Sequence, residues 1–367
     1  MPPARPQLAL LVLVATLLAG CGVTGTGDIA PTHGPSASSS PLGELTRHPD
    51  PSDVVGPTTA VLPDEAITPV TPVLEPQLPV TVTSHDRGAD VEVEVADASR
   101  VLALDMSGSI AATVWGLGLG DRLVGRDMST TFPGTEVLPV VTSGAHAVNV
   151  EAVLALRPTL IITDGTIGPR DVLEQLRHAG ITVVFVTNEA SFTGASQLAR
   201  DVAVILGVES SGELLAHRID RDVAEARAAI AAILPENNAL IPRVLFLYLR
   251  GATGVYYLFG EGSGADELIA GLGAIDVAAE MRWVGERPMT DEAVIVADPD
   301  VILVMTAGLE SAGGIDALLA AKPALALTHA GGNRRFVDMA DGDILSFGPR
   351  SAAVLDALAR AIYTRPE

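Results

Sequence analysis

The stretch RVLALDMSG, residues 100–108, is an apolar run that ends in a polar turn, and it has a counterpart later in the chain. RVLFLYLRG, residues 243–251, repeats its opening Arg-Val-Leu and its closing glycine 143 positions on (243 − 100). Short continuous apolar runs are typical of strands in a parallel sheet, because helices cover both faces of such a sheet. The repeat therefore predicts two lobes that share one topology.

A second pair of stretches gives nearly the same offset. NVEAVLALRPTLII, residues 149–162, matches TDEAVIVADPDVIL, residues 290–303, at an offset of 141 (290 − 149). In both regions strand-like runs alternate with helical segments, which is the pattern of α/β folds with right-handed crossovers. The sequence predicts two α/β lobes with parallel sheets.

The lobes are predicted to be joined by one long helix. Within residues 191–235, the run SGELLAHRIDRDVAEARAAIAAIL has apolar residues at a spacing of three or four, as expected for an amphipathic helix. We therefore predict an N-terminal lobe at residues 98–190, a linking helical segment at 191–235 and a C-terminal lobe at 236–367. The ligand cleft is expected between the lobes, outside the carboxyl ends of their strands.

The N-terminus has the features of a secretory signal peptide over residues 1–21. Arg5 precedes an apolar run over residues 8–18, and small residues then lead to Cys21. This ending resembles the lipobox of bacterial lipoproteins, in which the cysteine is lipidated and becomes the mature N-terminus. The apolar run is shorter than the roughly 20 residues that span a bilayer. We therefore expect Cys21 to anchor the protein on the outer face of the cell membrane.

Residues 22–97 are predicted to be a tether, whose last part adds at most an extended strand to the folded domain. The segment is rich in Pro, Ser, Thr and Gly, as in GPSASSSPLGE and TPVTPVLEPQLPVTV, and has little helical or strand periodicity. Such a composition buries too little apolar surface to offset the entropy lost on ordering.

Composition and motifs exclude several classes of function. The 367 residues are 48% hydrophobic with a net charge of −22, and basic stripes for binding nucleic acid are missing. A single cysteine, Cys21, excludes internal disulfides and thiolate metal clusters. Gly-x-Ser-x-Gly, His-Glu-x-x-His and P-loop motifs are also missing. A turn at Ser107 to Ser109 imitates a nucleophile loop but has no evident base, so we expect no enzyme.

The phrases DMSGSIAATVWGLGLGDRLVGRD, NVEAVLALRPTLII and YYLFGEGSGADELI, with the lipobox and the two lobes, resemble the metal-chelate substrate-binding proteins of bacterial ABC importers. Within that class they most resemble the haem-binding lipoproteins of actinobacteria. The resemblance implies a monomeric, lipid-anchored receptor outside the cytoplasm that carries haem to an ABC permease and its ATPase.

Tyr248 is the main candidate for an axial ligand of haem iron. It aligns with Asp105 at the carboxyl end of a strand, and a tyrosinate oxygen is a recognised haem ligand. A phenol ionises near pH 10, so a neighbouring cation must favour the charged form. Arg250 lies on the same strand face by the period of two and is placed to hydrogen-bond the oxygen. The alternative is a core tyrosine beside a surface arginine.

His146 lies in a strand-to-helix loop of the first lobe, and a neutral imidazole is a natural second axial ligand. The resemblance implies that it faces Tyr248 across the cleft, whereas a solvated loop histidine is the ordinary alternative. His329 stays open as a further candidate. Weaker candidates for apolar walls and for cations that hold the haem propionates are Met106, Met128, Tyr256, Tyr257, Leu258, Phe259, Arg126 and Arg282.

Glu151 and Glu292 align under the repeat, and each follows an N-cap candidate by two residues. Acids in the first turn of a helix interact favourably with its dipole, which is a sufficient structural role. The resemblance adds that one glutamate on each lobe pairs with arginines of the permease.

Three other readings stay open from the sequence. A receptor of the same class could bind a ferric siderophore or cobalamin without any side chain ligating the metal. A hydrolase built on α/β lobes and a purely structural or adhesive lipoprotein are the alternatives from other classes.

Overall fold

The computed structural model describes residues 40–86, 89–250 and 255–365. The predicted signal peptide and Cys21 therefore lie outside the described residues. All of the described elements belong to one compact unit, Pro35–Glu367. None of the helices in the described ranges is both long enough and apolar enough to cross a bilayer.

The first lobe is built on a three-stranded parallel sheet with the order β4-β7-β8. These strands are Val101–Leu104, Leu160–Thr163 and Thr182–Phe185. Every residue of β4 and β7 is buried, as their continuous apolar sequence predicts. The helices of this lobe are α1 (Ser109–Gly116), α2 (Val150–Leu156) and α3 (Arg170–His178), and a short hairpin is formed by β5 (Thr142–Ser143) and β6 (Ala147–Val148).

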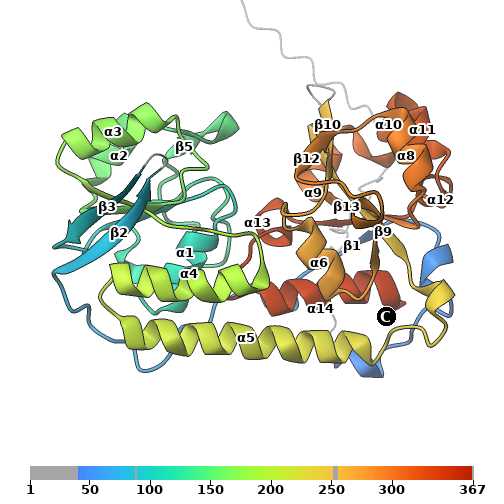
Figure 1. Cartoon of the computed structure of the whole chain (residues 1–367), viewed down its shortest axis with the longest axis horizontal. Coiled ribbons are helices and arrows are strands. Elements are labelled where there is room, and N and C mark those ends of the chain that lie inside the picture. Colours follow the sequence, from blue (N-terminus) through green and yellow to red (C-terminus); the bar gives the residue numbers. More distant parts are fainter. Residues whose placement is uncertain (1–39, 87–88, 251–254, 366–367) are drawn as a thin grey trace, which may run out of the picture. The chain divides into compact units, whose positions relative to one another are not determined.

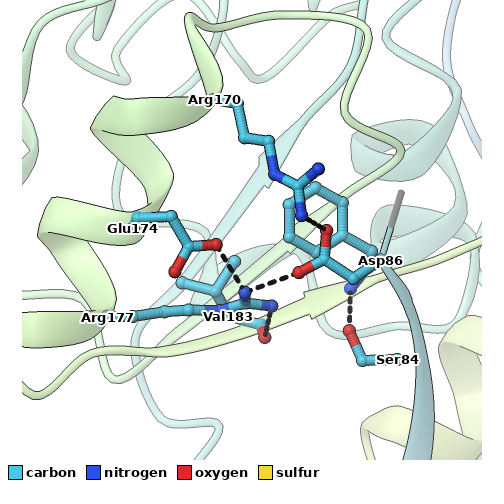
Figure 2. Close-up of polar contacts among 7 residues, drawn as sticks. Ser84, Asp86, Arg170, Glu174, Arg177 and Val183 are labelled. Carbon is cyan, nitrogen blue, oxygen red and sulfur yellow. Dashed lines mark hydrogen bonds and ion pairs between the residues drawn. The ribbon is translucent and has the colours of Figure 1, made fainter. Parts of the chain in front are cut away.

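An antiparallel hairpin of β2 (Val80–Asp86) and β3 (Ala89–Val95) packs beside β8. Figure 2 shows how Asp86 ties this hairpin to α3: its carboxylate accepts from Arg170 at 2.6 Å and from Arg177 at 2.8 Å. Ser84 accepts a further hydrogen bond from the backbone N–H of Phe185 at 2.9 Å. The hairpin is therefore fixed to both the sheet and a covering helix.

Two packed helices lead out of the first lobe, α4 (Phe192–Ile205) and α5 (Glu209–Ala231) (Figure 1). The chain reverses between them at Gly207, whose φ of +66° favours glycine. The 23 residues of α5 lead to the second lobe and also pack on α14 (Ser351–Tyr363). The α/β fold with two lobes and one long connecting helix is confirmed.

The second lobe has a mixed sheet with the order β1-β14-β13-β9-β10-β12, and β11 also pairs with β9. The strands are β1 (Thr58–Thr59), β9 (Arg243–Arg250), β10 (Val255–Phe259), β11 (Ile275–Asp276), β12 (Glu286–Pro288), β13 (Val301–Met305) and β14 (Phe336–Met339). The helices before α14 are α6 (Ala265–Gly271), α7 (Val277–Glu280), α8 (Asp291–Ala297), α9 (Thr306–Ser311), α10 (Gly314–Ala321), α11 (Pro323–Ala326), α12 (His329–Gly332) and α13 (Asp341–Ile344).

The sequence repeat extends to strand register. In the first lobe Val101 is the partner of Leu160, and in the second Val244 is the partner of Val301. These pairs are related by the offsets of 143 (244 − 101) and 141 (301 − 160) that the sequence gives. The two central strand pairs are therefore equivalent.

The lobes differ where those first strands end. Asp105 accepts from the backbone N–H groups of Ser109 at 2.9 Å and Ile110 at 3.2 Å, so the chain turns at once into α1. In the second lobe Tyr248 stands at the position of Asp105 and carries no carboxylate to cap a helix. There β9 continues to Arg250 and pairs antiparallel with β10. The second sheet is therefore mixed rather than parallel throughout.

Residues 40–86 and 89–97 differ from the predicted tether, because they pack against both lobes. Leu42, Leu62 and Val70 are buried in the main core, and β1 pairs in parallel with β14. These apolar residues do not recur at the spacing of a strand or a helix. They are buried by contacts with distant parts of the chain instead. The remaining predicted boundaries of the lobes and the linking segment stay predictions.

Candidate functional site

A cavity of about 640 Å³ lies where the two lobes meet. From the first lobe its lining comes from the segments that follow β4, β7 and β8, and these residues are Met106, Ser107, Ser109, Asp164, Thr166, Asn188 and Ala190. From the second lobe the residues are Tyr248, Arg250, Tyr257, Phe259, Ser263, Glu286, Met305, Asp341, Leu345 and Phe347. The carboxyl ends of the three parallel strands of the first lobe thus open on the cavity, as expected for an α/β sheet.

Tyr248 and Arg250 lie on the cavity face of β9. The Arg250 Nε–H donates to the Tyr248 hydroxyl oxygen at 2.7 Å, and the guanidinium carbon lies 5.7 Å from the ring centroid. The Tyr248 ring stacks on Phe259 with centroids 5.5 Å apart and planes 14° apart. The phenol oxygen is therefore held at hydrogen-bond distance from a guanidinium on the cavity face of β9.

The two walls of the cavity differ in chemistry. On the first lobe, Asp164 accepts from Asn188 Nδ2 at 2.9 Å and from Thr166 Oγ1 at 2.5 Å. On the second lobe, the wall has six aromatic or large aliphatic side chains, Tyr248, Tyr257, Phe259, Met305, Leu345 and Phe347, beside the polar residues Arg250, Ser263, Glu286 and Asp341. A flat, largely apolar ligand with a metal centre fits this arrangement, because the second wall offers stacking surface and one phenol oxygen.

Two buried carboxylates, Asp105 and Asp127, lie behind the lining of the first lobe. Asp105 accepts from the Ser107 hydroxyl at 2.7 Å, and its backbone N–H donates to Asp127 Oδ2 at 3.1 Å. Burial, and next the charge of Asp127, raise the pKa of Asp105 to about 8. Burial also raises the pKa of Asp127. Because of these two carboxyl groups, we expect the stability of the first lobe to depend on pH.

We expect the stability of the protein to fall as the pH rises from 5 to 7.5, and Asp105→Asn to remove part of this dependence. Between its ordinary pKa of 3.8 and the folded pKa of about 8, Asp105 holds more protons in the folded than in the unfolded state. One proton corresponds to about 1.4 kcal/mol per pH unit. Urea unfolding of both proteins across this range measures the difference, and a constant difference would contradict the shift.

His146 lies outside the cavity lining. It ends a 3₁₀ turn, Gly144–His146, in the β5–β6 hairpin, and its φ of +56° is unusual for a residue other than glycine. Its Nδ1 is buried and has no hydrogen-bond partner among the described residues. Strained backbone is concentrated at functional sites, and a buried polar atom without a partner calls for an explanation.

The structure divides the weaker candidates by strand alternation. Tyr257 and Phe259 line the cavity, whereas Tyr256 and Leu258 are buried on the opposite face of β10, where Lys322 lies 4.5 Å from the Tyr256 ring centroid. The expectation that Tyr256 and Leu258 form cavity walls is therefore not met.

The candidate cations Arg126 and Arg282 are also outside the lining. Arg126 donates to the backbone carbonyl of Thr130 at 3.0 Å, and Arg282 is exposed after α7. Of the two methionines that the sequence analysis named, Met106 lines the cavity and Met128 does not. Among the described residues that line the cavity, Arg250 is the one cation, and the carboxylates are Asp164, Glu286 and Asp341.

The structure places His329 away from the cavity, and it brings into the cavity some residues that the sequence analysis did not name. His329 lies 3.5 Å from Asp53 and 3.0 Å from Asn333, outside the cavity lining. Asp164 and Asn188 follow the strands PTLIITD and ITVVFVT, so their position after a parallel strand was a signal that could have indicated them. Phe347 precedes α14 and carried no such signal.

Glu151 and Glu292 are exposed at equivalent positions of α2 and α8. Asn149 Oδ1 caps α2 by accepting from the Ala152 N–H at 3.1 Å. Thr290 Oγ1 caps α8 by accepting from the Ala293 N–H at 3.2 Å. The predicted capping is therefore present in both lobes, and neither glutamate belongs to the cavity.

Comparison with known proteins gives matches over most of the chain. A family model described as periplasmic binding protein matches residues 106–341. The crystal structure of the haem-binding protein HmuT is 38% identical with a TM-score of 0.80, and the match covers 86% of this chain and 100% of that one. HmuT has also been solved as variants in which a histidine, a tyrosine or an arginine two positions after the tyrosine is replaced by alanine.

Two curated relatives are more distant. A cobalamin-binding protein of Halobacterium salinarum is 28% identical over 303 residues, which are 79% of each chain. An uncharacterised ABC transporter substrate-binding lipoprotein of Bacillus subtilis is 26% identical over 292 residues, which are 78% of this chain and 86% of that one. The similarity spans about four-fifths or more of each relative.

Proposed function

Because the chain belongs to the periplasmic binding protein family, we propose that it is the substrate-binding component of an ABC importer and that its cargo is haem. The observation that carries the proposal is the Tyr248–Arg250 pair in the cavity between the lobes, with a hydrogen bond of 2.7 Å. The spacing of this pair equals that of the tyrosine and arginine replaced in HmuT, a haem-binding protein with 38% identity to this chain.

Tyr248 is proposed to ligate the haem iron through its phenolate oxygen. An anionic oxygen is a hard donor suited to ferric iron, and tyrosine is an established axial ligand. The Arg250 Nε–H, which donates to that oxygen at 2.7 Å, would hold it in position for the iron. The aromatic stacking of Tyr248 on Phe259 fixes the ring, so the oxygen is already oriented before the cargo binds.

The apolar wall of the second lobe is proposed to receive one face of the porphyrin. Tyr257, Met305 and Phe347 would bury that face and add dispersion contacts. Haem here is cargo rather than a resident cofactor, because the protein must release it to the permease. Catalysis has no part in this proposal, and the family consists of binding proteins.

His146 is proposed as the second axial ligand. Its Nδ1 is buried in the β5–β6 hairpin, so Nε2 is the nitrogen left to bind iron. Because His146 does not line the cavity in the described structure, the hairpin has to approach the cargo on binding. Its strained backbone and unpartnered nitrogen support a conformation that is completed by the ligand.

Replacing His146 by alanine should weaken hemin binding by roughly tenfold and shift the Soret band, because one axial bond is lost while Tyr248 remains. Absorption titration of both proteins with hemin measures the affinity and the spectrum. His329→Ala is the matched control, since that histidine lies outside the cavity lining. A variant with the parent spectrum and affinity would remove His146 from the ligand set.

Membrane attachment and delivery complete the proposed function. Cys21 is proposed to carry the lipid that anchors the protein on the outer face of the membrane, as the name of the Bacillus subtilis relative supports. Glu151 and Glu292 are proposed to dock on the permease. Their support is that both are exposed on equivalent helices, one in each lobe.

Cobalamin is the second candidate cargo, favoured by the relative from Halobacterium salinarum. Parallel titrations of the apo protein with hemin and with cyanocobalamin test the choice. Haem binding predicts a new Soret band with hemin and no response to cyanocobalamin. Tight binding of cyanocobalamin together with a hemin spectrum equal to that of free hemin would overturn the proposal.

A further inference from the structure

The charged side chains of the cavity are mostly acidic. Within the lining that the structure describes, Arg250 faces the three carboxylates of Asp164, Glu286 and Asp341, which gives a formal charge of −2. Residues 251–254, which follow Arg250, are Gly-Ala-Thr-Gly and carry no charge. Haem brings two propionates, and each is an anion at neutral pH. The cavity therefore has the same sign of charge as the edge of its proposed cargo.

Arg250 is committed to Tyr248 rather than to a second anion. Its Nε–H donates to the Tyr248 hydroxyl oxygen at 2.7 Å, and its guanidinium carbon lies 5.7 Å from the centroid of the same ring. A propionate that drew the guanidinium away would take this hydrogen bond from the proposed iron ligand. The cation is therefore better assigned to the phenol oxygen than to a propionate.

Strand register directs a carboxylate, and not the arginine next to it, toward the cavity. In the pairing of β10 with β12, Glu286 is the partner of Phe259 and Arg287 is the partner of Leu258. Residues directly opposite each other in an antiparallel pair lie on one face of the sheet. Phe259 lines the cavity, whereas Leu258 is buried on the other face. Arg287 is therefore on the face that points away from the cargo.

The hydroxyl groups on the first-lobe wall already have acceptors within the protein. Ser107 Oγ donates to Asp105 at 2.7 Å, so the hydrogen bond of 2.8 Å between Ser107 and Ser109 uses the proton of Ser109. Thr166 Oγ1 donates to Asp164 at 2.5 Å. A hydroxyl has one proton to donate. These three hydroxyls therefore have no proton left for a propionate.

The second-lobe wall is similar in this respect. Ser263 Oγ donates to the backbone carbonyl of Gly260 at 2.6 Å. Asp341 accepts from the backbone N–H of Ala307 at 2.9 Å, which holds its carboxylate beside the cavity. A propionate placed against this wall would meet carboxylates and a serine whose proton is already used.

We propose that the cavity discriminates between ferric porphyrins by the charge of their edges. It accepts a porphyrin whose carboxylates all lie in solvent, and it excludes one that has to bring a carboxylate against Asp164, Glu286 or Asp341. The inference rests on the proposed function, which supplies a ferric porphyrin as cargo. The propionates of haem share one edge of the ring, so both can face solvent together. The cavity is open to solvent, since Met106, Arg250 and Glu286 of its lining are exposed.

Three ferric porphyrins test the inference on the parent protein in one detergent buffer: hemin, its dimethyl ester, and an iron porphyrin with four propionates spread around the ring. The ester should bind with a Kd within about threefold of that of hemin, because no contact of the propionates is lost. The porphyrin with four propionates should bind roughly a hundredfold more weakly, because bringing like charges together in an interface is costly. Added salt should narrow this gap by screening. Titrations followed at the Soret band measure each Kd.

Neutral variants test the part that the carboxylates take. Glu286→Gln and Asp341→Asn should each lower the ratio of the Kd of the four-propionate porphyrin to the Kd of hemin by roughly tenfold, since one repulsive charge is removed. Both porphyrins are measured on the same variant, so a smaller folded fraction changes both values alike and cancels in the ratio. Glu94→Gln is the matched control, because it removes the same charge from β3, outside the cavity lining, and should leave the ratio at the parent value.

The outcomes separate this inference from the proposed function. A loss of more than tenfold for the dimethyl ester would show that the protein holds the propionates, which would overturn the inference while haem stands as the cargo. A ratio that both carboxylate variants leave at the parent value would overturn it as well. If none of the three porphyrins gives a new Soret band, the proposed function fails and the inference fails with it.

Discussion

Replacing Tyr248 by phenylalanine should weaken hemin binding by roughly a hundredfold, the largest effect expected from any single change in the cavity. Phenylalanine keeps the ring that stacks on Phe259 with centroids 5.5 Å apart, so packing is retained and only the oxygen is lost. Without that oxygen the iron loses its proposed anionic ligand. Hemin titration followed at the Soret band measures the loss, and a changed spectrum should accompany it.

Tyr257 gives the matched control. It lines the same cavity and is the cross-strand partner of Tyr248, but the Arg250 Nε–H donates to Tyr248. Tyr257→Phe should therefore retain the parent spectrum and most of the affinity. Arg250→Gln should fall between the two, because the phenolate loses its cation but not its contact with iron. A larger loss of hemin affinity for Tyr257→Phe than for Tyr248→Phe would show that Tyr257, and not Tyr248, is the ligand.

Much of the fold could be predicted because the chain contains two similar lobes. The offsets between residues 100–108 and 243–251 and between 149–162 and 290–303 relate the strand pair Val101–Leu160 to the pair Val244–Val301. A repeat carries information on strand pairing that one lobe does not, since the same spacing has to satisfy both sheets. The repeat gave no indication of the feature in which the lobes differ, the antiparallel pairing of the end of β9 with β10.

The candidate site was predictable to the extent that it depends on local geometry. The period of two in a strand places Tyr248 and Arg250 on one face, and the hydrogen bond between them agrees with it. The same rule separates Tyr257 from Tyr256, but only once it is known which face of β10 opens on the cavity. That face is set by pairing with β9, and pairing between the two strands is not visible in either stretch alone.

The segment over residues 40–97 could not be predicted because its stability comes from distant partners. Thr58 and Thr59 form a strand only by pairing with Val337 and Asp338 of β14. Thr59 Oγ1 also donates to the Asp338 carboxylate at 2.9 Å. A composition rich in proline and threonine gives no periodic signal for such contacts, so the sequence alone favoured disorder.

Arg335 holds this segment and the C-terminal helix to the second lobe. It is fully buried, and its guanidinium donates to Thr58 Oγ1 at 2.8 Å and to the carbonyl of Ala361 at 2.6 Å. The carbonyl lies in the last turn of α14, where the helix dipole is negative and carbonyls lack partners within the helix. Burial lowers the pKa of Arg335 to about 10, which leaves it charged at neutral pH.

Arg335→Met should therefore lower the free energy of unfolding by about 3 kcal/mol, because at least two buried hydrogen bonds are lost and their acceptors stay buried. Urea unfolding followed by circular dichroism measures the change. Arg334→Gln is the neighbouring control, since Arg334 is paired with Asp316 at the surface and should leave the unfolding midpoint near that of the parent. Equal midpoints for the two variants would show that the contacts of Arg335 with Thr58 and α14 add little stability. A large loss confined to Arg335→Met would instead support a folded rather than tether-like role for the segment around Thr58, because the guanidinium joins Thr58 to α14.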